Sequence, residues 1–228
     1  MRRIFLCFLI YFCITNYCYA APCIGTRMPQ ENQFFAGFQS HSVLNRYLAD
    51  GYGKMRSLQE FFLISYGIFD WLSLDAKGGA GYIKRHPVGA DEIDYSAYLG
   101  GGYGLRLQLY NNEQTKVIFG FQHVSVHPHK IHVNGIKNKA VLDDWQFSLL
   151  ASRNFSMFTP YIGTKWSRMD YINWLNGERS RIKSDLTRDV GLVFGVDLPM
   201  PFDEKMWLNI EGQFFDVEAF AVSLNSEF

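Results

Sequence analysis

Residues suited to acid–base or nucleophilic chemistry gather in one short stretch, HVSVHPHKIH, which contains four of the six histidines. His123 and Ser125 are two positions apart, so both side chains lie on one face of an extended strand. An imidazole beside a hydroxyl is the minimum for acyl transfer, and a carboxylate such as Asp144 would be needed to orient the ring. The stretch therefore supplies a candidate nucleophile and a candidate base on one strand.

The same stretch could also hold a metal ion. His127 and His129 would share a strand face, where neutral imidazoles can bind zinc or copper. Pro128 interrupts the strand pattern, and no cysteine or fixed acidic partner completes a local ligand set. A solvated, histidine-rich loop that includes His132 explains the pattern as well. We therefore assign no metal site and expect no cofactor.

The chain begins with the features of an exported protein. Arg2 and Arg3 precede a short apolar run that ends in the cleavage pattern Cys18-Tyr19-Ala20, which predicts a cleaved signal peptide over residues 1–20. The leader contains three of the four cysteines, so Cys23 has no partner for an intramolecular disulfide. The 22 basic and 22 acidic residues balance, which argues against a nucleic-acid-binding protein.

After a lead-in at residues 21–32, which we expect on the periplasmic side, the chain forms extended segments with alternating side chains. In Tyr95–Tyr110, leucines and tyrosines share one face, and glycines and Arg106 share the other. A helix would spread this pattern around its whole surface, so a strand is favoured. The expected segments are 33–46, 57–68, 71–82, 95–110, 115–126, 142–153, 158–172, 186–198, 206–215 and 218–228.

The connections between these segments alternate in length, and aromatic residues gather at both segment ends. No apolar run after the leader is long enough for a membrane helix. These features predict an all-β, antiparallel up-and-down transmembrane β-barrel over residues 33–228, with about ten strands and with eight or twelve left open. A soluble β-sandwich or lipocalin-like barrel with an apolar interior is the alternative.

Charged and polar residues on one face of the segments would line the barrel interior. In a barrel this narrow such side chains would pair across the bore and nearly fill it, leaving at most a thin aqueous path. The lumen-lining residues that we predict are Asp75, Lys77, Tyr98, Arg106, Lys165, Glu211 and Gln213.

The last segment, EAFAVSLNSEF, has an apolar face and ends on an aromatic residue. It resembles the closing strand of bacterial outer-membrane β-barrels, and together with the hairpin YGIFDWL at Tyr66–Leu72 it makes the chain similar to small outer-membrane proteins of Gram-negative bacteria. The resemblance implies that Phe228 belongs to a signal read by the barrel-assembly machinery. It also implies a monomer in the outer membrane, in contact with lipid and lipopolysaccharide.

We therefore expect a non-enzymatic outer-membrane barrel with a structural or surface-interaction role. A narrow porin-like channel for small solutes or ions is one alternative. The spacing of His123 and Ser125 is similar to that in outer-membrane lipid A deacylases, which implies a lipid-modifying hydrolase as another. Outer-membrane proteases would need an Asp-x-His pair, which occurs nowhere in the sequence. Cations of the longer loops would attract lipopolysaccharide phosphates, although ordinary solubilising charge explains them as well.

Overall fold

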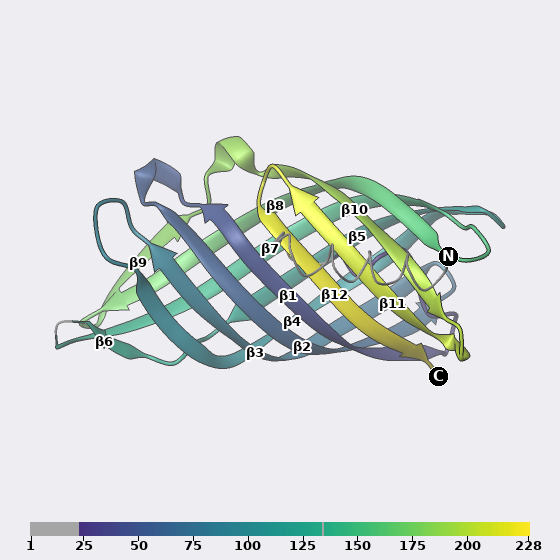
Figure 1. The fold of residues 1–228 in the computed structure, drawn as a ribbon, viewed down its shortest axis with the longest axis horizontal. Helices are drawn as coiled ribbons and strands as arrows, with labels where there is room; N and C mark the ends of the chain where they lie inside the picture. The colour runs from purple at the N-terminus through teal and green to yellow at the C-terminus, as the bar shows by residue number, and fades with distance from the viewer. Residues whose placement is uncertain (1–22, 134) are drawn as a thin grey trace, which may run out of the picture.

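The computed structural model describes residues 23–133 and 135–228, so the expected signal peptide lies outside the described residues. Ten strands form one closed antiparallel barrel, in which the first strand also pairs with the last (Figure 1). The barrel strands are β1 (Phe34–Tyr47), β2 (Lys54–Phe69), β3 (Leu72–His86), β4 (Ile93–Asn111), β5 (Thr115–Val126), β7 (Ile136–Arg153), β8 (Thr159–Leu175), β10 (Val190–Met200), β11 (Asp203–Phe214) and β12 (Glu218–Glu227).

The two ends of the barrel differ, and the predicted alternation of short and long connections is confirmed. Short turns at 70–71, 112–114, 154–158 and 201–202 lie at the end where the chain terminates (Figure 1). The opposite end, called the outer end below, carries the longer connections. These include β6 (Ile131–Val133), β9 (Glu178–Lys183) and two short 3-10 turns, η1 (Ala49–Gly51) and η2 (Leu186–Arg188). Among the described residues, no helix is long and apolar enough to cross a membrane.

Through most of the barrel, apolar side chains face outward and polar ones face inward. In β3, Leu74 is 48% exposed, while the adjacent Asp75 is 5% exposed. In β8, Ile162 is 56% exposed, while Lys165 is 2% exposed. A soluble protein buries the opposite set, because an apolar wall in water and charges in the core are both unfavourable. The soluble alternative is therefore wrong for this part of the barrel, whose outer wall suits lipid.

Toward the outer end, the polarity of the interior reverses. Tyr95 and Tyr171 are both fully buried there, and their hydroxyl oxygens are 3.1 Å apart. We did not predict this feature, which we call the apolar cap. Its members are Leu48, Met55, Phe61, Ile83, Tyr95, Val124, Val126, Ala140, Leu142, Met169 and Tyr171.

The expected strand limits agree with the structure to within a few residues, and the larger differences lie at the outer end. β5 has the expected limits, but β7 begins at Ile136 rather than 142 because its first residues pair with β6 and with the end of β8. Residues 186–188 were expected in a strand and form η2 instead. Asp185 caps that turn by accepting bonds from the hydroxyl and the N–H of Thr187, which lower the pKa of its carboxyl group.

Candidate functional site

The bore holds six of the seven predicted lumen residues, beginning with a buried ion pair between neighbouring strands. Arg106 donates from Nε to Asp75 Oδ2 at 2.9 Å and from Nη2 to Asp75 Oδ1 at 2.8 Å. This two-point geometry is the strongest form of a guanidinium–carboxylate pair. Higher in the bore, Lys77 Nζ donates to Gln122 Oε1 at 2.9 Å. The lower interior is therefore cross-linked by charges and is not an open lumen.

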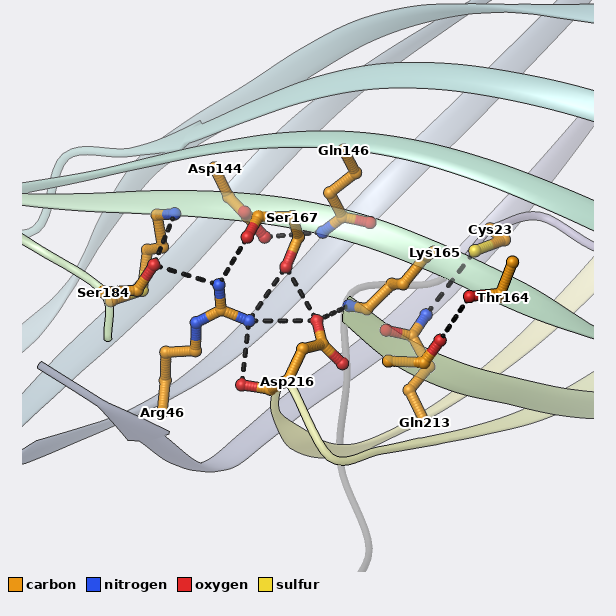
Figure 2. A network of polar contacts seen from close by, with 12 residues as sticks. Cys23, Arg46, Asp144, Gln146, Thr164, Lys165, Ser167, Ser184, Gln213 and Asp216 are labelled. Atoms are coloured by element: carbon orange, nitrogen blue, oxygen red, sulfur yellow. Dashed lines mark hydrogen bonds and ion pairs between the residues drawn. The ribbon is translucent and has the colours of Figure 1, made fainter. Parts of the chain in front are cut away.

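A second group of charges lies where β1, β8 and the β11–β12 turn meet (Figure 2). Asp216 Oδ2 is 3.0 Å from Arg46 Nη1 and 3.0 Å from Lys165 Nζ, and it accepts a bond from Ser167 Oγ at 2.7 Å. Arg46 also donates to Ser184 Oγ at 3.0 Å. Of these residues we predicted only Lys165 in the lumen. The one sequence feature that could have drawn attention to Asp216 is its charge, next to Val217 in a short turn.

The lead-in also occupies the bore, since its described residues run inside the barrel wall. The backbone N–H of Cys23 donates to Glu211 Oε1 at 2.7 Å, and Gln213 donates to the same carboxylate oxygen at 2.6 Å. Further along, the carbonyl oxygen of Arg27 accepts a bond from Arg106. Glu211 and Gln213 therefore lie in the lumen, where we placed them from the sequence, and they hold the chain's own N-terminal segment there.

Tyr98 does not join the other predicted lumen residues. Its side chain is 47% exposed, and its ring lies 4.2 Å from that of His129. Tyr98 borders an irregularity in β4, where three residue steps from Tyr98 to Tyr95 match two steps on β3, and Tyr95 fills the interior. β5 also ends at Val126, opposite Gly100, and leaves Tyr98 uncovered.

On the outward face of β4, β5, β7 and β8, polarity changes over three successive cross-strand rows. The lowest row is apolar, the middle row is amphipathic and the third is polar. From lowest to highest they contain Leu105, Phe121, Phe147 and Trp166, then Tyr103, His123, Trp145 and Arg168, then Gly101, Ser125, Asp143 and Asp170. Amphipathic rings and arginines settle at the level of lipid headgroups, so the middle row, called the amphipathic row below, marks the membrane surface on this side.

Ser125 lies just above that level and contacts two groups suited to acyl transfer. Its Oγ is 2.9 Å from His127 Nε2 and donates to Asp143 Oδ1 at 2.5 Å. His123 Nε2 is 3.6 Å from the same carboxylate oxygen. The carboxylate expected here was Asp144, but that side chain points into the barrel, where it accepts a bond from Gln146 at 2.5 Å. Asp143 takes the position because it is the direct cross-strand partner of Ser125.

The other histidines of the stretch lie apart from one another. His129 stacks on Tyr98, and His132 is an exposed residue of β6. Within the described part of the chain, no three His, Cys, Asp or Glu side chains approach closely enough to hold a metal ion. His127 lies against the Ser125 hydroxyl instead.

The C-terminal Phe228 pairs with the start of β1. Its N–H donates to the Phe34 carbonyl oxygen at 2.8 Å, and the two rings stack with centroids 5.3 Å apart. At 59% exposure the Phe228 ring faces outward beside the seam between the first and last strands. The predicted assembly signal thus lies at the place where the barrel closes.

No family model and no curated protein matches the chain. Among solved structures, the outer membrane protease OmpT of Escherichia coli aligns at 13% identity and a TM-score of 0.46, over 90% of this chain and 99% of that one. Ail, the attachment invasion locus protein of Yersinia pestis, aligns at 9% identity and a TM-score of 0.43, over 88% and 100%. The translocator domain of NalP from Neisseria meningitidis gives 10% and 0.44, over 86% and 87%.

These similarities concern the fold, and no activity is transferred from them. Three features of the structure identify the fold: the apolar outer wall around a polar bore, the closed ring of strands and the amphipathic row. The fold is that of a bacterial outer-membrane β-barrel.

Proposed function

We propose that this protein is a closed, non-enzymatic barrel that acts through its outer surface and conducts neither ions nor solutes. The observation that carries the proposal is a bore obstructed at successive heights. The N-terminal segment and the Arg106–Asp75 pair occupy its lower part. The charged group formed by Asp216, Arg46 and Lys165 lies above them, and the apolar cap fills the outer end. At the short-turn end there is a pocket of about 560 Å³, lined by Thr26–Gln30 and the turns. An ion would have to displace an apolar core to pass.

The narrow-channel alternative makes the opposite prediction, so conductance decides between the two. Refolded mature protein in a planar lipid bilayer should insert and remain electrically silent. Arg106→Ala and Glu211→Ala should stay silent as well, because the apolar cap above them is unchanged. Steady, reproducible current steps from the unaltered protein would refute the closed barrel and favour the channel.

A second candidate function is hydrolysis of lipid esters at Ser125. It is favoured by one specific observation, the contact of Ser125 Oγ with His127 and Asp143 on the outward face beside the amphipathic row. The ester bonds of membrane lipids lie near headgroup level, so a substrate would reach the hydroxyl without entering the bore.

The chemistry follows the usual course of covalent acyl transfer. Ser125 Oγ would attack the ester carbonyl after its hydroxyl turns from Asp143 to a neutral His127 Nε2, which takes the hydroxyl proton and returns it to the leaving alcohol. Water would then cleave the acyl-serine with the same imidazole as base, releasing the fatty acid. The Asp143 carboxylate, which also lies 3.6 Å from His123 Nε2, would stabilise the positive charge that develops on the His127 imidazole.

Ester turnover in mixed micelles tests this second candidate. Ser125→Ala and His127→Ala should abolish hydrolysis of a long-chain p-nitrophenyl ester, and Ser96→Ala, an exposed serine of β4, should leave it unchanged. The absence of turnover by the unaltered protein, or equal turnover by all four proteins, would exclude the site. Folded barrels are selected first by their resistance to detergent unfolding at room temperature, so that loss of turnover is not loss of the fold.

Export by a cleaved signal peptide and insertion by the barrel-assembly machinery are part of the same proposal. The intact mass of the protein isolated from outer membranes should be lower than the 26.4 kDa of the full chain by the mass of residues 1–20. A full-length mass would contradict cleavage.

A further inference from the structure

The outward face of β7, β8 and β9, from the amphipathic row upward, is strongly basic. Ile182 of β9 packs against the apolar cap, so the residues that alternate with it face outward. All of those residues in β9 are cations, and they continue onto β7 and β8. We call this surface the basic face, and its members are Lys139, Arg168, Arg179, Arg181 and Lys183.

An aromatic ring orders two of these cations. Lys139, Trp174 and Arg179 form one cross-strand row from β7 through β8 to β9. The Lys139 Nζ lies 4.9 Å and the Arg179 Cζ 5.8 Å from the centroid of the Trp174 ring. Cation–π contacts of this kind hold both cations near the ring and so restrict the conformations of the two side chains. The basic face therefore has two positive groups that contact the same ring, one from each neighbouring strand.

The nearby acids do not neutralise the basic face. Asp170 is buried and is shared by Arg168, at 3.6 Å, and Arg181. Asp143 is already bonded to Ser125. Among residues 23–133 and 135–228, no carboxylate pairs with the three remaining cations, which are Lys139, Arg179 and Lys183. This excess positive charge faces outward directly above the membrane surface.

The height of the basic face matches a lipid partner. From Trp145 and Arg168 in the amphipathic row to Lys139 and Trp174 the strands advance by six residues, which is roughly 20 Å along a strand and roughly 14 Å above the membrane surface at a tilt of about 45°. The headgroups and attached sugars of an outer-leaflet glycolipid occupy that layer. Their phosphates carry the opposite charge and accept bonds from guanidinium and ammonium groups.

We propose that the basic face binds the phosphate groups of outer-leaflet lipid headgroups, so that the lipid of its own membrane is the partner of this barrel. This inference rests on the proposed surface role and names its ligand class. The two cations that contact Trp174 take one phosphate, and Lys183, nearer the membrane surface, takes a second. Arg181 stays with Asp170 and is a positioning residue for β9.

The probe is a bisphosphorylated diglucosamine lipid, compared with the same lipid without phosphates. Refolded mature protein in detergent micelles is titrated with each lipid, and bound lipid is counted by native mass spectrometry. The unaltered protein should retain the phosphorylated lipid preferentially. The triple variant Lys139→Gln/Arg179→Gln/Lys183→Gln should lose about a hundredfold in affinity, because each cation near a membrane surface contributes roughly fivefold. It keeps the bond between Arg181 and Asp170, so β9 stays attached.

A matched control removes the same charge elsewhere on the outer end, with Lys54→Gln/Arg56→Gln/Lys130→Gln. The control should bind the phosphorylated lipid within about twofold of the unaltered protein if the basic face is the site. Equal losses in the two triple variants would mean general attraction to a positive rim and would overturn the inference. Equal retention of the two lipids would overturn it as well. Either result leaves the closed barrel standing, because its silence in the bilayer is measured without this lipid.

Discussion

Removing one partner of the buried Arg106–Asp75 pair should destabilise the barrel far more than removing both. Both side chains are at most 3% exposed, and the guanidinium meets the carboxylate through two bonds. Arg106→Met leaves a buried carboxylate without a counter-charge, and Asp75→Asn leaves a buried guanidinium. Each change should lower the free energy of unfolding by about 3–5 kcal/mol. The double variant Asp75→Leu/Arg106→Met leaves no buried charge at this position and should cost less than either single change.

Urea unfolding of the refolded protein in detergent micelles measures these differences. A loss of about 4 kcal/mol at a slope of about 2 kcal/mol per molar urea moves the midpoint by roughly 2 M, well beyond experimental error. Lys84→Met is the control, because Lys84 and Asp94 form an ion pair at 2.6 Å whose side chains are 33% and 52% exposed. A solvent-exposed pair contributes little to stability, so the control midpoint should move by less than about 0.5 M.

The double variant decides whether the reasoning is correct. If the pair acts as a unit, the cost of the double change lies below the sum of the single costs by several kcal/mol. A double variant as unstable as the sum would show that each residue acts separately, for example through water or through Ser65, which also bonds Asp75. Single variants as stable as the Lys84→Met control would refute a buried, water-excluded bore.

Two further predictions concern the ends of the chain. Gly25 has a φ of 67°, and a Cβ added there would lie 2.9 Å from a side chain of the barrel wall. Gly25→Val should therefore displace the N-terminal segment from the bore and raise modification of Cys23 by a charged thiol reagent at least fivefold. Gly51→Val is the control, because Gly51 has a similar φ of 72° but open space around it, and it should leave the modification of Cys23 unchanged. Phe228→Ala should lower the fraction of chains assembled in cells more than the yield of refolding in detergent, and equal effects in both assays would contradict a role in recognition.

The strands were predictable because side-chain alternation is a local property. In β5 the sequence alone gave both limits, and in β3 the alternation of Leu74 with Asp75 and Lys77 assigned faces that the structure shows. The charges expected inside followed from the same alternation. Tyr98 was misplaced because it borders a position where β4 has one extra residue relative to β3, and no local pattern announces such a bulge.

The partners of the buried charges could not be predicted. Arg46 and Asp216 are 170 residues apart and meet only because β1 and the β11–β12 turn adjoin in the closed barrel. The choice between Asp143 and Asp144 raised a related difficulty. Adjacent residues of a strand face opposite sides, so selecting the one beside Ser125 requires the register between β5 and β7.

The apolar cap shows why alternation alone leaves the inside and the outside of a barrel undecided. In β8, Lys165 faces the bore, yet Met169 and Tyr171 further along the same face belong to an apolar core. The outward face changes in the opposite sense, from Trp166 through Arg168 to the buried Asp170 and the cations beyond it. One strand therefore has the polarity of a membrane barrel below and of a soluble barrel above. The crossover coincides with the amphipathic row, and the bore is filled on both sides of it, which is why we propose a role for the outward face.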